Sequence, residues 1–421
     1  MREMRDSGIE WVGQIPKGWE LRRAKTLFTQ SNSKGNKIEV LLSPTQKYGV
    51  VPQSQLEGVV QVKEDTDLQM FKTIHKGDFV ISLRSFQGGF EYSLYEGVCS
   101  PAYQVFYPTS PICDTYYRYL FKSQSFISKM NNLTVGIREG KNIQYIDFAN
   151  SQIPVPPIAE QERIAVFLNA ECAEIDAVLE KTRASIEEYK KLKQAIITQA
   201  VTKGIRGDRP MKDSGIEWIG DIPAEWNKDK VIRVFSVIGS GTTPKSSDEN
   251  LFDGNTPWIQ SGDINGENLF VTKNCVSNSA IESYSALRVY QAPYLVVAMY
   301  GASVGNLSLS MIDACVNQAC CVLKKPTINL KFAFYIFKAV KDYLARKAVG
   351  GGQPNISQET IKQLWLTIPS ADEQIEISNY LDEKCRSVDA LIAKKQQYLT
   401  EIENYKKSLI YEYVTGKKEV V

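Results

Sequence analysis

Two long stretches of the chain carry apolar residues at the spacing of a helix seam. Residues 159–202 contain no Pro or Gly and are rich in Glu, Lys, Ala and Gln, and a heptad with two apolar positions fits 168–200. The same register falls on 381–413. We predict two helices of about 40 residues, roughly 60 Å each, packed on each other. The alternative is that each helix lies separately on its own domain, and Lys193 and Lys406, at the same heptad position, weaken the predicted seam.

The chain repeats itself around these helices. MRDSGIEWVGQIPKGW at 4–19 recurs as MKDSGIEWIGDIPAEW at 211–226, with 11 of 16 positions identical. In a second repeat, 156–181 aligns with 369–394, and the alignment continues to 201–202 against 414–415. The order is therefore globular unit, helix, globular unit, helix. The predicted boundaries are 1–155, 156–207, 208–368 and 369–421.

The globular units are predicted to be mixed α/β. Short β-rich stretches at 78–83, 102–107, 294–299 and 320–323 alternate with Gly, Asn, Asp and Pro turns. Helical patterns occur at 116–130 and 330–345. The middles of the two units do not resemble each other, so the pattern predicts two different surfaces on a duplicated scaffold.

Composition narrows the class of protein. A length of 421 residues predicts two to three domains, and no apolar run reaches the ~18 residues of a membrane span. The N-terminus lacks a secretory pattern, and eight cysteines without a CxxC pair favour reduced thiols in a cytoplasmic protein. The net charge of +2 is far from that of a free-standing nucleic-acid binder, so DNA binding requires local basic patches or partners.

No candidate catalytic motif in the sequence is complete. The one histidine, His75, has none of the spacings of a triad or a zinc site. GIREGKN at 136–142 is one residue short of a phosphate loop, and Asn142 replaces its hydroxyl. VPPI at 155–158 lacks both the polar and the aromatic residue of an adenine methyltransferase tetrad. The sequence predicts recognition without catalysis.

These motifs together resemble the specificity subunit of type I restriction–modification systems. They are the repeated DSGIEWxGxIPxxW, the IPVPPIAEQ entry to a long helix, LRSFQGGF…GVCSPAYQVF, PWIQSGDI, YGASVG…VNQACCVL and GGGQPNISQETI. The resemblance covers essentially the whole chain, although PSAD at 369–372 departs from the fuller PPIAE of the first helix opening.

The resemblance implies a non-catalytic subunit. Each globular unit is then a target recognition domain that reads one half of a bipartite double-stranded DNA sequence, and the two helices pack antiparallel. Two modification subunits that methylate adenine dock on the helices, and restriction subunits complete the complex. S-adenosylmethionine, ATP and Mg are bound by those partners, so no cofactor and no metal is expected here.

Polar side chains in the Gly-rich loops are the candidates for DNA contact, because Arg to guanine and Asn or Gln to adenine are the usual bidentate pairs. For the first unit they are Arg84, Ser85, Gln87, Arg138 and Lys141. For the second unit they are Ser261, Asp263, Tyr300, Ser303, Asn306 and Gln353. Asn142 and Asn355 occupy equivalent positions in both copies and are expected to cap helices or fix loops. Two other readings stay open: a coiled-coil adaptor unrelated to DNA, and an enzyme with an unrecognised site.

Overall fold

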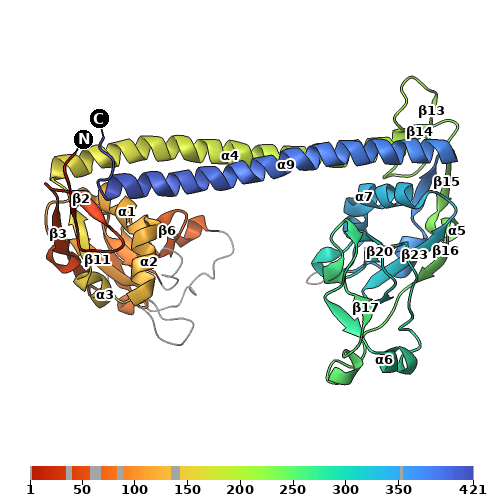
Figure 1. Ribbon diagram of the computed structural model, residues 1–421, viewed down its shortest axis with the longest axis horizontal. Coiled ribbons are helices and arrows are strands. Elements are labelled where there is room, and N and C mark those ends of the chain that lie inside the picture. The colour runs from red at the N-terminus through yellow and green to blue at the C-terminus, as the bar shows by residue number, and fades with distance from the viewer. Residues whose placement is uncertain are drawn as a thin grey trace. The chain divides into compact units, whose positions relative to one another are not determined.

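The computed structural model describes residues 2–34, 40–56, 68–82, 89–133, 143–350 and 354–420. It divides into two compact units, Met1–Arg183 with Gln397–Val421 (unit 1) and Ala184–Gln396 (unit 2). Each unit combines one mixed α/β domain with part of both long helices (Figure 1). The predicted fold class is confirmed.

Unit 1 is built on an antiparallel sheet of order β4-β11-β8-β9. Its strands are β4 (Phe28–Ser31), β11 (Gln104–Pro108), β8 (Phe79–Ile81) and β9 (Phe90–Tyr92). Smaller two-stranded pairings surround it: β3 (Glu20–Arg23) with β12 (Gln152–Val155), β5 (Leu42–Thr45) with β6 (Gly49–Pro52), and β7 (Lys72–Ile74) with β10 (Gly97–Cys99). Three helices, α1 (Asp114–Lys122), α2 (Gln124–Leu133) and α3 (Tyr145–Asn150), contribute to its core. That core is aromatic, and Phe28 alone meets five other rings at centroid distances of 5.3–5.8 Å.

The single helix predicted at 116–130 is two helices. Ser123 leaves the helical region, with φ −66° and ψ 137°, and its hydroxyl donates a 2.7 Å hydrogen bond to the Leu120 carbonyl. A serine that satisfies the end of a turn in this way competes with helix continuation, which is why the helical pattern is interrupted.

Unit 2 is built on a five-stranded sheet of order β16-β23-β20-β21-β18. Its strands are β16 (Phe235–Gly239), β23 (Cys320–Pro326), β20 (Tyr294–Ala298), β21 (Leu307–Ser310) and β18 (Asn268–Leu269). A three-stranded sheet joins β19 (Asn274–Val276), β17 (Thr256–Ile259) and β22 (Cys315–Val316), and β15 (Asn227–Lys230) pairs with β24 (Trp365–Ile368). The short helices are α5 (Val231–Val234), α6 (Asn278–Ser283) and α8 (Gln358–Lys362).

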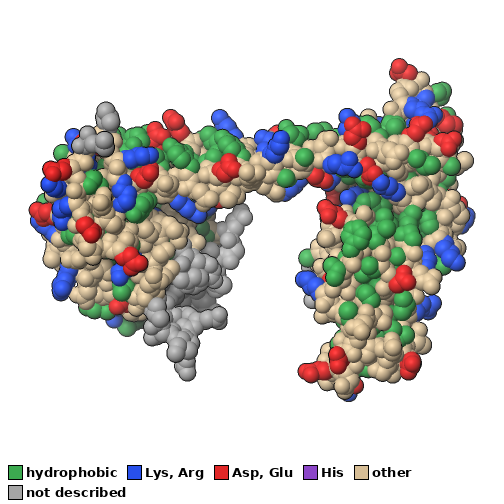
Figure 2. Space-filling model, viewed as in Figure 1, with side chains coloured by type: hydrophobic (Ala, Val, Ile, Leu, Met, Phe, Trp, Pro, Cys, Tyr) green, Lys and Arg blue, Asp and Glu red, His purple; other side chains and the backbone are tan. Residues whose placement is uncertain are grey.

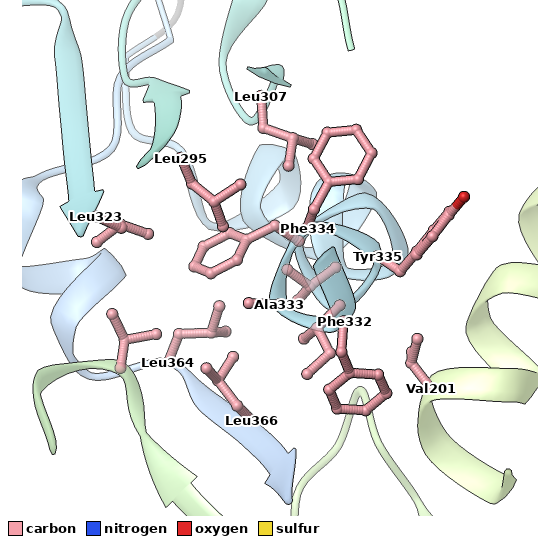
Figure 3. Close-up of a cluster of buried hydrophobic side chains, with 14 of the residues drawn as sticks. Val201, Leu295, Leu307, Leu323, Phe332, Ala333, Phe334, Tyr335, Leu364 and Leu366 are labelled. Atoms are coloured by element: carbon pink, nitrogen blue, oxygen red, sulfur yellow. The ribbon is translucent and has the colours of Figure 1, made fainter. Parts of the chain in front are cut away.

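Helix α7 (Leu330–Lys347) fills the core of unit 2 (Figure 3). Asn329 caps its start by accepting hydrogen bonds from the amides of Lys331 and Phe332. Phe332 and Ala333 are fully buried among side chains of the sheet, of β24 and of the long helix. Burial of a side chain as large as Phe332 stabilises the fold by about 1.5–3 kcal/mol.

The two predicted long helices are α4 (Ile158–Lys203) and α9 (Ala371–Val414). They run antiparallel in each unit: as the residue number increases along α4, the number of its contact partner on α9 decreases. In unit 1, Phe167 meets Tyr413 at 4.4 Å between ring centroids and Asp176 pairs with Lys406 at 2.6 Å. In unit 2, Lys395 lies 5.7 Å from the Tyr189 ring.

The seam consists of the predicted heptad residues. Leu168, Leu179, Leu381 and Leu409 are each at most 4% exposed. The lysines expected to weaken the seam each find a carboxylate on the facing helix: Lys193 pairs with Asp389 and Lys406 with Asp176, both at 2.6 Å. These four residues are equivalent in the two copies, so the ion pair is duplicated with the repeat.

The repeated DSGIEWxG segment forms the same hairpin twice, β1 (Met4–Asp6) with β2 (Gln14–Pro16) and β13 (Met211–Asp213) with β14 (Asp221–Pro223). In the first copy the Asp6 carboxylate accepts the Gly8 amide at 3.0 Å, and in the second Asp213 accepts Gly215 at 2.8 Å. Both glycines have positive φ, +68° and +66°, which disfavours any side chain there. The turn thus accounts for the Asp and the Gly of the repeated segment.

Each hairpin docks on the start of a long helix through one carboxylate, which is buried in unit 2 and half-buried in unit 1. In unit 2, Glu373 accepts a 2.6 Å bond from Arg209 and a 2.8 Å bond from the Trp226 indole. Glu160 does the same in unit 1. Its donors there are Arg2 and Trp19, the counterparts in the repeat. The two repeated segments, the hairpin and the start of the long helix, therefore contact each other in each unit.

Candidate nucleic-acid interface

Three segments of unit 2 that are far apart in sequence meet where β20 ends and β21 begins. The Gly301 amide donates to the Pro354 carbonyl at 2.9 Å, and Tyr300 forms a β-bridge with Asn355. The Asn306 side chain reaches the Ile264 carbonyl at 3.5 Å. The segments at 257–264, 300–306 and 354–361, which belong to separate sequence motifs, therefore meet in one place, called the loop cluster below.

Tyr300, Ser303 and Asn306 present polar groups on this loop cluster. The Tyr300 side chain is 45% exposed, and the hydroxyl of half-buried Ser303 donates to the Tyr300 carbonyl at 3.1 Å. Asn306 is half-buried and lines a cavity between the loop cluster and the helices. These three residues are in position to meet a ligand that lies against the cluster.

Asp263 holds its own loop together. One carboxylate oxygen accepts the Gln260 amide at 2.9 Å and the other accepts the Lys273 amide at 3.3 Å. Ser261 opens the same short turn, Ser261–Asp263, and is half-buried. The structure gives both residues a place in loop geometry, and their contact with DNA stays a prediction.

Six of the predicted contact residues lie outside the described part of the chain: Arg84, Ser85, Gln87, Arg138, Lys141 and Gln353. Asn142 does so too. Asn355 is described, and its backbone exchanges hydrogen bonds of 2.9 and 3.0 Å with Val349.

A lysine-rich cavity adjoins the loop cluster in unit 2. It has a volume of about 350 Å³ and is bounded by α4, α7, α9 and the loop ends at Gly266 and Asn306. Its cations are Lys190 and Lys193 of α4 and Lys338 and Lys341 of α7. Blue side chains line the long helices where they meet the domain of this unit (Figure 2). The sequence analysis missed this group, because its members are spread over 150 residues and only the fold assembles them.

Unit 1 holds a counterpart cavity of about 190 Å³. Lys406 and Ile410 line it, at the repeat positions of Lys193 and Ile197. Helices α1 and α7 also correspond: Tyr119 donates to Asn169 at 2.9 Å, and Tyr335 donates to the equivalent Asp382 at 2.6 Å.

One turn after these tyrosines, α1 and α7 each carry a lysine that lines its cavity, Lys122 in unit 1 and Lys338 in unit 2. Burial lowers the pKa of both lysines. In unit 1, Lys122 pairs at 2.6 Å with Glu91, whose side chain is 1% exposed. Burial raises the pKa of Glu91 to about 7, against the opposing effect of Lys122.

Thiol and metal chemistry find little support in the described residues. Burial raises the pKa of Cys320 and Cys321 to about 12, which disfavours the reactive thiolate. Within the described ranges, no three His, Cys, Asp or Glu side chains gather as a metal site. Across those same ranges, no helix is both long and apolar enough to cross a membrane.

Comparison with known proteins identifies the family. The model of the type I restriction modification DNA specificity domain matches residues 16–188 and again 223–404. A putative type I restriction enzyme MjaX specificity subunit of Methanocaldococcus jannaschii is 23% identical, over 97% of this chain and 96% of its own length. The EcoBI specificity subunit of Escherichia coli is 20% identical, over 69% of this chain and 63% of its own.

Solved structures share the fold. A chain from a type I R-M system superimposes with a TM-score of 0.73 at 16% identity, covering 96% of this chain and 99% of that one. The HsdS subunit of Thermoanaerobacter tengcongensis gives a TM-score of 0.51 at 16% identity, covering 96% and 98%. The family model matches the chain twice, and the hairpin and the long helix are also present twice. The chain belongs to the family of type I restriction–modification DNA specificity subunits, which recognise DNA and are not themselves catalytic.

Proposed function

We propose that this chain reads an asymmetric, bipartite DNA sequence, with one half-site for each globular domain. The observation that carries the proposal is the loop cluster of unit 2, where three distant segments gather polar side chains beside a group of lysines. Such a surface combines groups that can reach base edges with cations that can hold phosphates. The domain of unit 1 has a different sheet and different loops, so it presents a different surface to DNA.

Within this proposal, Tyr300, Ser303 and Asn306 contact the second half-site. Asn306 is the candidate for a bidentate contact to adenine, provided its amide releases the Ile264 carbonyl, a bond that at 3.5 Å is long. Ser261, Asp263 and Gln353 complete the predicted set for this domain. Arg84, Ser85, Gln87, Arg138 and Lys141 are proposed for the first half-site.

The partners follow from the duplication. We propose that two modification subunits dock on the repeated helices, one at each repeat, because equivalent surfaces suit two identical partners. Restriction subunits join them, and S-adenosylmethionine, ATP and Mg are bound by these partners. Since its substrate is the genome, the complex is proposed to act in the cytoplasm.

An exchange of domains tests the modular reading. Residues 211–368 are replaced by the second domain of another family member, the hybrid is expressed with its modification subunits, and the methylated sequence is read from the genome. One half of the motif should change and the other should stay. A change in both halves contradicts the proposal.

A matched control separates recognition from scaffold. Replacing residues 211–226 by 4–19 of the same chain exchanges one copy of the hairpin for the other, and 11 of its 16 residues are already identical. The methylated motif should then be unaltered, since the hairpin docks on the helix and contributes nothing to the loop cluster.

A further inference from the structure

Lys338 has no counter-ion among the residues that the structure describes. It lies on α7 and lines the lysine-rich cavity of unit 2. Its ammonium group sits 4.6 Å from the Phe334 ring centroid and 6.0 Å from that of Tyr335. Among the described residues no carboxylate lies within ion-pair distance of it. A half-buried ammonium without an anion is costly, because its hydration is lost and not replaced.

The two acids that line the cavity, Asp389 and Glu267, form no ion pair with Lys338. Both oxygens of Asp389 accept from Lys193, at 2.7 and 2.6 Å. Glu267 lines the cavity but forms no ion pair with any described residue. The four lysines of the cavity therefore face two carboxylates, and the excess positive charge lies on the α7 side, at Lys338 and Lys341.

The other half of the chain shows how such a lysine is normally satisfied. Lys122, on the corresponding turn of α1, pairs at 2.6 Å with the buried Glu91 of β9. In unit 2 the loop ends that line the cavity include Gly266, Glu267 and Asn306, and the one acid among them, Glu267, forms no ion pair with any described residue. The same scaffold thus pairs the lysine with an internal carboxylate in unit 1, whereas Lys338 of unit 2 has no ion-pair partner among the described residues.

We propose that the cavity of unit 2 is a phosphate-binding site, and that its ligand is a phosphodiester of the DNA backbone. Lys338 and Lys341 bind the phosphate oxygens, and Lys193 adds to the field. The inference rests on the proposed function and refines it, because Asn306 lines the same cavity and a phosphate fixed there sets the register of the loop cluster on the bases.

The test is the salt dependence of DNA binding by the complex with modification subunits. Each phosphate contact contributes about 0.9 to the slope of log K against log salt. Lys338→Met should lower the slope by about 0.9 and weaken binding equally for cognate and altered duplexes. Lys338→Arg should restore the slope, which separates loss of charge from loss of folding. An unchanged slope in Lys338→Met overturns the inference.

The matched control is the double variant Lys122→Met with Glu91→Gln. It removes the corresponding lysine together with its internal anion, so the net charge of unit 1 is unaltered at a pH above 7, where Glu91 is ionised. The slope should equal that of the unaltered complex. A decrease as large as that of Lys338→Met would show a general effect of charge removal, and would overturn the assignment to one site.

A second readout distinguishes this inference from the proposed function. Acylation of lysines in the isolated chain, followed by mass spectrometry, reports whether inorganic phosphate or a duplex protects Lys338. Protection by the duplex at concentrations where inorganic phosphate has no effect supports the phosphodiester. Protection by inorganic phosphate alone places a free anion there and overturns DNA as the source. If no duplex is bound in any assay the proposed function fails, and lack of protection by either probe overturns the site itself.

Discussion

The carboxylate of Glu373 should be among the most costly single groups to remove from unit 2. It is 3% exposed and accepts bonds from Arg209, 12% exposed, and from the Trp226 indole, at 2.6 and 2.8 Å. Glu373→Ala leaves a buried indole N–H unpaired, and it leaves the largely buried guanidinium with only the exposed Glu225 at 3.0 Å and the Lys203 carbonyl at 2.9 Å. Removal of one partner from a buried ion pair costs about 3–5 kcal/mol.

Glu376→Ala is the matched control, because Glu376 lies one turn further along α9 and also pairs with an arginine. That pair is exposed, 55% for Arg206 and 48% for Glu376. An exposed pair contributes about 0–1 kcal/mol. Any effect of negative charge near the helix start is shared by the two variants to within a few tenths of a kcal/mol.

Hydrogen exchange of the amides in 211–226 measures the cost locally, which avoids treating two units as one two-state system. Because about 1.4 kcal/mol corresponds to a tenfold change, Glu373→Ala should speed exchange there by roughly two to three orders of magnitude. The hairpin at 4–19 should be unaffected. Equal, small effects of Glu373→Ala and Glu376→Ala would refute the claim that this carboxylate locks the hairpin to the helix.

Two further predictions concern unit 1. Arg84→Ala should cost about 1–3 kcal/mol of binding against the cognate duplex and relax one base position, as methylome sequencing would show; uniform weakening across sequences would make Arg84 a phosphate contact. The raised pKa of Glu91, about 7 against 4.5, means that the folded state holds this proton more tightly than the unfolded state. Stability of unit 1 should therefore fall as the pH rises from about 4.5 to 7, and urea titrations at several pH values should show this dependence disappear in Glu91→Gln; a stability that rises over that range through this residue would contradict the assignment.

The repeat made the scaffold predictable. Heptad positions such as Leu168 and Leu381 are buried in the seam, because a 3.5-residue period keeps one apolar stripe of each helix facing its partner. The repeat of Trp19 as Trp226 predicts that both units contain the same structural element at this place. What the repeat could not reveal is that they bind Glu160 and Glu373, since hydrogen-bond partners 141 and 147 residues apart leave no local pattern.

The candidate site was only partly predictable. Loop motifs pointed to Tyr300, Ser303 and Asn306, and the fold brings them together. Lys122 and Lys338 escaped notice because the middles of the two domains do not align, so their correspondence appears only once α1 and α7 are seen against the long helices. The sequence predicts that Lys193 weakens the helix seam, whereas in the structure its positive charge is paired with Asp389.

The most direct test of the central claim is the adenine methylome of cells that carry this chain with its modification subunits, compared with cells lacking this chain alone. Two different recognition domains on a duplicated scaffold predict one additional methylated motif, made of two unlike half-sites separated by unspecified bases. That motif should vanish with the chain while the modification subunits remain. A motif that persists without the chain, or one whose two halves are identical, would contradict the account.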